Sequence, residues 1–211
     1  FNKEFISEYI RTPEDLIHLI SHEILHKVRG DLRRSSPDRS TKPCLQKFLS
    51  NVAADILINA RLGRPPFSNH APFLAQLYGT KTLWSALLCP PWHLFGQSKL
   101  KNSDLQKKAK EAFKEIFSRQ HPGPSNNLKE LERFAQRTAR LYVLGWRGFP
   151  SFESFFASLS DLAQEINFST NFFCLSDAYP DPFCDESGCP LDSLPFIGDH
   201  GKEEKDEHPL W

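Results

Sequence analysis

The sequence contains no methionine, and none of its hydrophobic runs approaches the roughly 20 residues that a transmembrane helix needs. It also has no excess of charge, because 26 basic side chains balance 26 acidic ones and the pI is near 7.2. The lack of a long apolar run argues against a membrane protein. The neutral balance gives no support to nucleic acid or to an acidic membrane as a partner.

Cysteine is scarce, with five residues scattered between Cys44 and Cys189. An odd, scattered set argues against a disulfide scaffold and favours a reducing compartment. No stretch of the chain resembles a signal peptide. We therefore expect a cytoplasmic protein.

The most informative segment that is present is His22-Glu23-Ile24-Leu25-His26. Residues i and i+4 lie on one face of an α-helix, so His22 and His26 can reach a single metal ion. Glu23 follows the first histidine and can take a proton from a water molecule on that ion. The pattern is typical of zinc hydrolases, but it is short enough to arise by chance, so its context must decide.

Thr12-Pro13-Glu14-Asp15 predicts the start of the helix that carries this motif. Thr12 can cap the free backbone N–H groups, Pro13 suits the first turn, and the two acids favour the positive helix end. Gly30 predicts the end of the helix. The apolar set is too wide for a surface helix, so we expect this helix to be mostly buried. The set comprises Leu16, Ile17, Leu19, Ile20, Ile24, Leu25 and Val28.

A second helix is predicted from about residue 45 to residue 62, where Gly63 follows. Asp55 and Asn59 form an i, i+4 polar pair inside a stretch of apolar and small residues. Burying a carboxylate there is costly unless a cation meets it. The cost of burying Asp55 therefore points to a cation between the two helices.

Catalytic zinc takes three protein ligands and keeps one position for water, so His22 and His26 need a third partner. We favour Asp55 over Asp31, which lies just past Gly30, and we place His70 third. We expect Asn59 and His18 to orient the ligands, because His18 shares the face of the two motif histidines. If Asp55 is the third ligand, Asp31 could also orient the ligands.

Four segments within roughly the first 62 residues form one pattern: Phe1–Ile6, Thr12–Asp15, His22–His26 and Asn51–Asn59. Together they resemble the zincin-type metallopeptidase domain that bacteria often encode beside von Willebrand factor A-type domains. The resemblance implies a His-Glu-x-x-His helix followed by a helix with an Ala-Ala-Asp-x-x-x-Asn core. It departs from the pattern at Asp31, where many members have a histidine, although an aspartate can also ligate zinc.

The predicted protein is mainly α, with at most a small sheet edge from residues 1–10, which form a strand or a turn. Residues 1–172 are expected to form a zincin-like metallopeptidase domain, with the metal site on two helices. Residues 173–211 are expected to form an irregular tail that contains prolines, cysteines and an acidic end.

The predicted function is zinc-dependent hydrolysis of a peptide or protein substrate, with one catalytic Zn²⁺ ion. Glu23 would accept the proton of the attacking water and pass it to the leaving amine. The alternative is an inactive zincin-like module that binds or regulates a partner, such as a von Willebrand factor A-type or ATPase protein.

Overall fold

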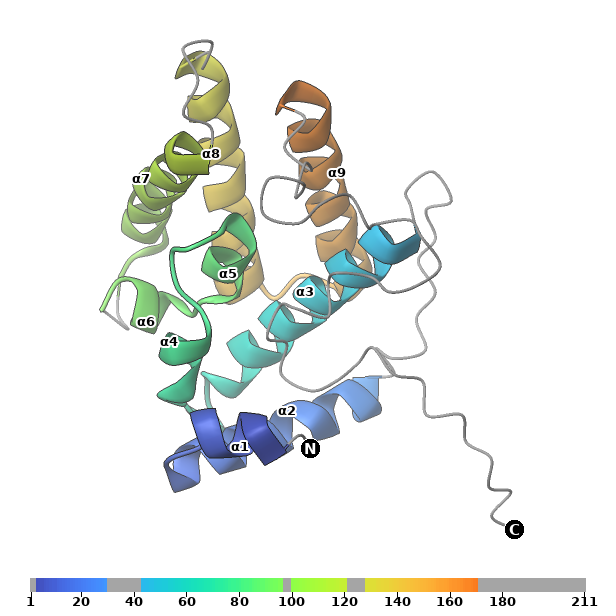
Figure 1. The fold of residues 1–211 in the computed structure, drawn as a ribbon, viewed down its shortest axis with the longest axis vertical. Coiled ribbons are helices and arrows are strands. Elements are labelled where there is room, and N and C mark those ends of the chain that lie inside the picture. The colour runs from blue at the N-terminus through green and yellow to red at the C-terminus, as the bar shows by residue number, and fades with distance from the viewer. Residues whose placement is uncertain (1–2, 30–42, 97–99, 121–127, 171–211) are drawn as a thin grey trace.

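A computed structural model describes residues 3–29, 43–96, 100–120 and 128–170 (Figure 1). The regular structure of these residues is helical, and they contain no strand, so the predicted mainly α class is confirmed. The elements are α1 (Lys3–Tyr9), α2 (Pro13–Arg29), α3 (Pro43–Leu62), α4 (Phe73–Leu77), α5 (Leu83–Leu88), α6 (Pro91–Leu94), α7 (Asn102–Gln120), α8 (Leu128–Val143), the π-helix η2 (Leu144–Gly148) and α9 (Phe152–Thr170).

The N-terminal residues form helix α1, so the prediction of a strand or turn there is wrong. The side chains of Phe5, Ile6, Tyr9 and Ile10 are partly buried against the core. Their spacing places them on one helical face, which explains why this short amphipathic segment winds into a helix. The Phe5 ring meets the Phe73 ring edge-on at 6.2 Å.

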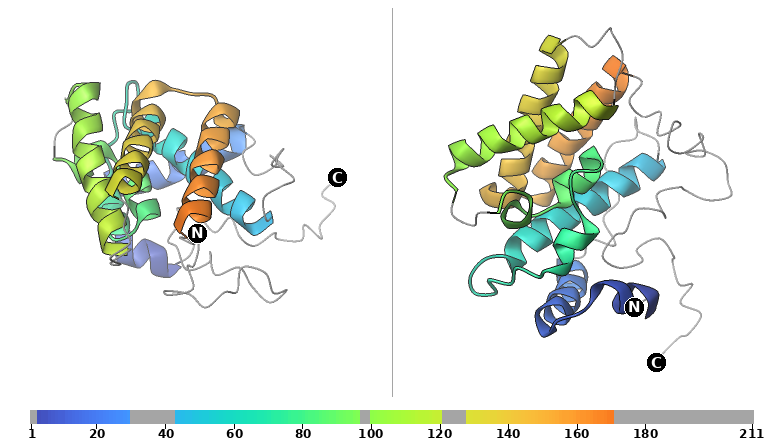
Figure 2. Two further views of the ribbon diagram at one scale, coloured as in Figure 1. Left: turned by 90° about the horizontal axis from the view of Figure 1, so that it is seen from above. Right: turned by 60° about the vertical axis from the view of Figure 1, so that its left-hand side comes forward.

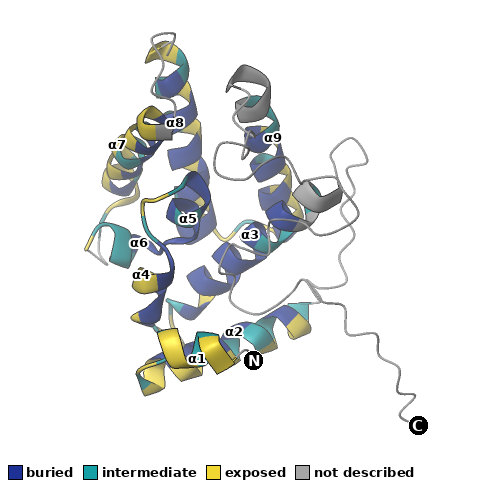
Figure 3. Ribbon diagram, in the orientation of Figure 1, coloured by how far each residue is buried: buried dark blue, intermediate teal, exposed yellow. Residues whose placement is uncertain are grey.

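Helix α3 is the centre of the fold. It lies between α2 on one side and the group of α8, η2 and α9 on the other (Figures 1 and 2). Most of its described residues are buried, whereas α1 and α2 carry many exposed residues (Figure 3). A helix covered on several sides has few positions for polar side chains, and those it holds need partners.

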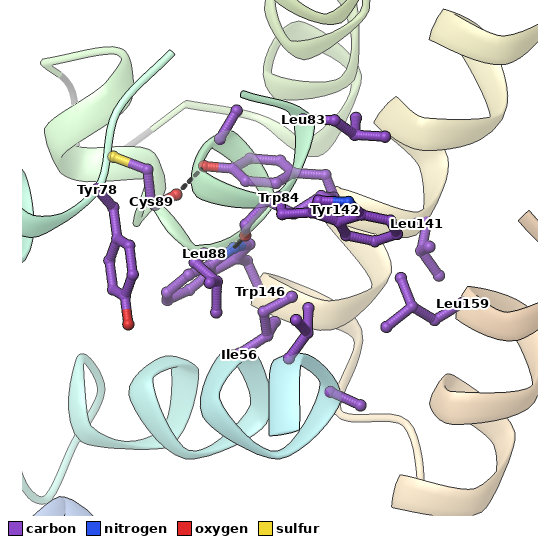
Figure 4. Close-up of a cluster of buried hydrophobic side chains, with 14 of the residues drawn as sticks. Ile56, Tyr78, Leu83, Trp84, Leu88, Cys89, Leu141, Tyr142, Trp146 and Leu159 are labelled. Atoms are coloured by element: carbon purple, nitrogen blue, oxygen red, sulfur yellow. Dashed lines mark hydrogen bonds between the residues drawn. The ribbon is translucent and has the colours of Figure 1, made fainter. Parts of the chain in front are cut away.

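The C-terminal helices meet α3 at one close approach, and hydrogen bonds from their buried aromatic side chains connect them to the end of α5. A Cβ atom on Gly145 would lie 2.8 Å from Ile56 and 2.6 Å from Phe155, so a larger residue at this crossing would displace these side chains. The Trp146 indole donates to the Leu87 carbonyl at 2.9 Å, and the Tyr142 hydroxyl donates to the Cys89 carbonyl at 2.7 Å (Figure 4). The close approach at Ile56 is next to Asp55 on α3.

The two predicted helices agree with α2 and α3 to within a few residues. Helix α8 ends at Val143 and continues as the π-helix η2. Residues 30–42, which include Asp31, and the whole predicted tail of residues 173–211 lie outside the described residues. No helix among the described residues has the length and hydrophobicity required to span a membrane.

Asp15 joins the start of α2 to α4. Its Oδ2 atom accepts hydrogen bonds from the backbone N–H groups of Arg11 and Thr12, at 3.2 and 3.0 Å. Its Oδ1 atom accepts one from the Phe73 N–H at 3.0 Å, and the Thr12 hydroxyl accepts from the Asp15 N–H. Burial raises the pKa of Asp15, but these hydrogen bonds outweigh it and leave the pKa below its ordinary value of 3.8.

We expect Asp15→Ala to lower the free energy of unfolding by about 2–4 kcal/mol at pH 7, because three backbone donors lose a charged acceptor. The pKa of the carboxyl is lower in the folded state than in the unfolded state. Its contribution is therefore present above about pH 3.8 and is lost as the pH falls through the folded-state pKa. Urea unfolding near pH 7 and near pH 2.5 should show the difference between variant and wild type shrinking in acid. The exposed Glu14→Ala variant is the control, and an equal loss in both variants would contradict this account.

Candidate metal centre

Helix α2 turns polar side chains toward α3 and most of its apolar side chains away from it. Asp15, His18, His22 and His26 are all buried. Of the predicted apolar set only Leu19 is buried, so the prediction of a mostly buried α2 is wrong. Five members are exposed, and we call them the outer stripe: Leu16, Ile17, Ile20, Ile24 and Val28.

The buried histidines face two polar residues of α3. Asp55 and Asn59 are fully buried and lie one turn apart on the same face of that helix. Two neighbouring helices thus bring imidazole, carboxylate and amide groups together out of contact with solvent. The sequence predicted this set of residues on these two helices.

The side chains of His22, His26 and Asp55 place three potential ligand atoms at one point. The Nε2 atoms of the two histidines are 2.9 Å apart. The Oδ1 atom of Asp55 lies 3.4 Å from the His22 nitrogen and 3.1 Å from the His26 nitrogen. Ligand atoms of a tetrahedral zinc site with bonds of ~2.0–2.1 Å are about 3.3–3.4 Å apart. The observed spacing therefore fits one small cation with little adjustment.

Asn59 determines which nitrogen of His22 can act as a ligand. Its Oδ1 atom lies 2.9 Å from His22 Nδ1 and 2.9 Å from His18 Nε2. With the amide oriented in this way, its carbonyl oxygen only accepts, so both nitrogens donate. The neutral His22 ring then keeps its lone pair on Nε2, the atom that faces His26 and Asp55. This is the tautomer that a histidine ligand needs.

Burying the carboxylate of Asp55 has the largest free-energy cost of any group at this site. Burial raises its pKa, but the adjacent His22 imidazole and the hydrogen bond from His26 outweigh that effect, and the pKa lies well below its ordinary value. The carboxylate is therefore ionised although its side chain is fully buried. Its Oδ2 atom has no hydrogen-bond partner among the described residues. A buried anion with one unpartnered oxygen is destabilising unless positive charge compensates it.

A cation would also explain how the three ligand atoms can lie so close together with too few protons for a hydrogen bond between each pair. With neutral rings, His22 Nε2 and Asp55 Oδ1 both present lone pairs, and His26 Nε2 can supply at most one proton between them. One of the three short distances would then join two lone pairs. A metal ion in contact with all three atoms replaces that repulsion with attraction. The donor set therefore fits a metal by both charge and spacing.

His18 and Tyr78 surround this cluster with neutral groups. Burial lowers the pKa of His18 to about 4, so its ring is uncharged near neutral pH and serves as a hydrogen-bond donor. Burial raises the pKa of the Tyr78 phenol, and the charge of Asp55 adds to that effect. Neither group supplies the positive charge that Asp55 lacks.

Glu23 follows His22 on α2 and is half-buried. Its Oε1 atom is shielded from solvent and has no hydrogen-bond partner among the described residues. An oxygen without a partner among the described residues can accept a proton without breaking a contact with them. This matches the behaviour expected of a general base.

Of the other two predicted ligands, His70 does not join the cluster. His70 is exposed, its Nε2 atom lies 3.1 Å from the Gly63 carbonyl, and its ring stacks on Trp92 at 4.5 Å. Among the described residues, the group of side chains that could share a metal is His22, His26 and Asp55. Asp31 lies outside the described residues.

No family model matches this chain, and no match was found among curated proteins or among solved structures.

Proposed function

We propose that this protein is a zinc-dependent hydrolase of the His-Glu-x-x-His type that acts on peptide bonds, with His22, His26 and Asp55 as the metal ligands. The observation that carries the proposal is the cluster itself: a fully buried carboxylate facing two imidazole nitrogens at 3.1 and 3.4 Å. When bound, zinc supplies a Lewis acid that acidifies water and polarises a carbonyl group.

Other residues of the chain orient the ligands and transfer the proton. Asn59 holds His22 in the tautomer whose Nε2 atom can ligate, and His18 shares the same amide oxygen. Glu23 accepts the proton of the attacking water and returns it to the leaving amine. The preference for a peptide or protein substrate comes from the resemblance of residues 1–62 to zincin-type metallopeptidases. The cysteine pattern leads us to place the activity in the cytoplasm.

One observation favours a second candidate, a zincin-like module that binds metal without turnover. His22 and Asp55 are fully buried and His26 is 2% exposed, whereas a catalytic zinc must keep a position open to water and substrate. Such a module would use the metal to hold α2 against α3. It could then act through a protein partner of the von Willebrand factor A or ATPase kind that the resemblance suggests.

The first test of the proposal is zinc binding. The chain, freed of metal with a chelator, is expected to bind one Zn²⁺ per molecule, measured by elemental analysis after gel filtration. Zinc at 1,000 times its dissociation constant should stabilise the folded state by about 4 kcal/mol, which calorimetry detects as a higher melting temperature. Mg²⁺ should have no such effect, because it prefers oxygen ligands.

Two histidine variants provide the matched comparison for this measurement. His22→Ala should abolish the zinc-dependent stabilisation, whereas His70→Ala should retain it, because His70 lies away from the cluster. Equal zinc responses in the two variants would place the ion elsewhere and refute the proposed centre. Hydrolysis is then assayed on an unfolded, fluorescently labelled protein.

A further inference from the structure

A cavity of about 230 Å³ lies at the C-terminal end of α3, where Gly63 follows the last residue of the helix. It is separate from the metal centre, because its lining includes none of the clustered ligands. No aspartate or glutamate lines it in the part of the chain that the structure describes. Its wall is mainly cationic, polar and aromatic, and includes Arg64, His70, Trp92, Asn102, Trp146 and Arg147.

Arg64 and Arg147 bring two positive charges to this cavity. Burial lowers the pKa of Arg64, and the nearby charges of Arg147 and Arg61 lower it further. An arginine side chain nevertheless keeps its charge near neutral pH. Neither Arg64 nor Arg147 forms an ion pair with an acidic side chain among the described residues. Like charges held close together are unfavourable, and an anion in the cavity would offset their repulsion.

The two guanidinium groups are positioned by hydrogen bonds to neutral oxygen atoms. Arg64 donates from Nη2 to the Trp146 carbonyl. Arg147 donates from Nη1 to the Leu100 carbonyl, and the same nitrogen lies 3.4 Å from the Asn102 Oδ1 atom. These contacts use one nitrogen of each group, whereas a guanidinium group carries five N–H donors. Both arginines therefore keep donors for a ligand.

The indole of Trp92 adds a further donor to the wall of the cavity. Its Nε1 atom is shielded from solvent and has no hydrogen-bond partner among the described residues. The ring is held by His70, which stacks on it at 4.5 Å, and by Trp146, which meets it edge-on at 5.6 Å. An indole N–H group can only donate, so this atom and the two arginines all require acceptor oxygens.

The backbone next to the cavity is strained. Arg147 belongs to the π-helix η2, and Phe149 follows η2 with φ 53° and ψ 47°, in the left-handed region. A bulky residue is rarely found there, and both π-helices and strain of this kind are frequent at functional sites. The Phe149 side chain is 62% exposed, so burial does not explain the conformation. Its ring centre lies 3.8 Å from the guanidinium carbon of Arg64, which the strained turn thus helps to orient.

We propose that this cavity binds a phosphate group, either as free phosphate or as part of a small phosphomonoester. A phosphate group on an ester carries a charge of about −1.5 to −2 at pH 7 and offers three strong acceptor oxygens. Its charge therefore balances the two arginines, whereas a carboxylate carries a single charge and would balance only one of them. Guanidinium groups also suit phosphate by shape, because they can donate two parallel hydrogen bonds to its oxygens.

The size of the cavity limits the rest of the ligand. Pockets for drug-sized molecules usually measure roughly 300–1,000 Å³, and this cavity is smaller, at about 230 Å³. It suits free phosphate or a phosphomonoester with a short organic chain better than a larger ligand such as a nucleotide. This inference does not depend on zinc or on hydrolysis, because the cavity and the metal centre share no ligand residue.

Isothermal titration calorimetry on the full chain tests the proposal. The chain is first freed of metal with a chelator and gel-filtered, so that phosphate cannot bind through an ion at the metal centre. We expect inorganic phosphate to bind at a single saturable site and acetate to bind more weakly. Glycerol 3-phosphate separates the two sources of the phosphate group: tighter binding than inorganic phosphate identifies a phosphomonoester, and binding no tighter identifies free phosphate. No saturable binding of either compound, or acetate binding as tightly as they do, would overturn the proposal.

Two arginine variants locate the binding site. Arg147→Gln should weaken phosphate binding by about 10–100-fold, the effect of losing a charge-assisted hydrogen bond. The control is Arg140→Gln, which removes the same charge from an exposed arginine of α8 that does not line the cavity. Equal losses of affinity in the two variants, or no loss in Arg147→Gln, would overturn the proposal.

Asn102→Asp tests the site while keeping the structural contact of Arg147. Aspartate retains an oxygen for Arg147 and suits the first turn of α7, so the melting temperature should not fall. Its negative charge should repel phosphate and weaken binding by at least about 10-fold. Ser103→Asp adds the same charge one residue along, outside the lining of the cavity, and should weaken binding less. Unchanged affinity in Asn102→Asp would show that Arg147 has only a structural role and would overturn the proposal.

Discussion

Replacing Glu23 with glutamine is expected to lower the rate of peptide hydrolysis by about 10²–10⁴-fold, the usual contribution of a general acid–base group. Glutamine has the same shape as glutamate but cannot accept a proton. Because the Oε1 atom of Glu23 has no hydrogen-bond partner among the described residues, the substitution should leave the fold intact. Zinc binding should remain at one ion per chain, because Glu23 is not one of the clustered ligands.

The comparison for this prediction is Glu14→Gln, an exposed glutamate in the first turn of the same helix. Its rate of hydrolysis should match that of the wild type. If Glu23→Gln hydrolyses as fast as Glu14→Gln, Glu23 is not the base. If the zinc-loaded wild type hydrolyses no peptide or protein tested, the result favours the second candidate, a module that binds metal without turnover, as the burial of the ligands also does.

Replacing Asp55 with asparagine is expected to weaken zinc binding by at least about 100-fold, the upper end of what loss of an orienting residue costs. Asp55 supplies the negative charge of the cluster, and an amide of the same size removes that charge. The zinc-dependent rise in melting temperature should disappear in this variant. Competition titration against a fluorescent chelator measures the change in the dissociation constant.

Asn59→Ala gives a graded comparison for the same titration. Asn59 orients His22 through a hydrogen bond and does not face the metal position, so its loss should weaken zinc binding by about 10–100-fold. The account therefore predicts a larger loss for the Asp55 variant than for the Asn59 variant. The reverse order, or an unchanged dissociation constant in Asp55→Asn, would contradict the assignment of the third ligand.

The residues of the candidate centre could be predicted from the sequence because each has a local signal. His22 and His26 have the spacing of one helical face, and Asp55 is a charged residue in an apolar helix. A buried charge carries a large free-energy cost, so its presence limits the arrangements that a stable fold can adopt. The structure brings these three side chains within 3.4 Å of one another.

The orientation of α2 could not be predicted from its hydrophobic pattern. The number of apolar residues suggested a buried helix, but the face that is buried is the one whose imidazoles contact α3. That outcome depends on Asn59 and Asp55, which lie 37 and 29 residues from the histidines they contact. In the same way, Asp15 was predicted as a helix-start acid, and its bond to Phe73, 58 residues away, has no local signal.

X-ray absorption at the zinc edge, on the chain loaded with one equivalent of Zn²⁺, tests the central claim most directly. The account predicts two imidazole nitrogens and carboxylate oxygen at about 2.0–2.2 Å, with the two-imidazole signature lost in His22→Ala. A nearest neighbour of sulfur at about 2.3 Å would place the ion on cysteines and contradict the account. A wild-type chain that retains no zinc after gel filtration would contradict it as well.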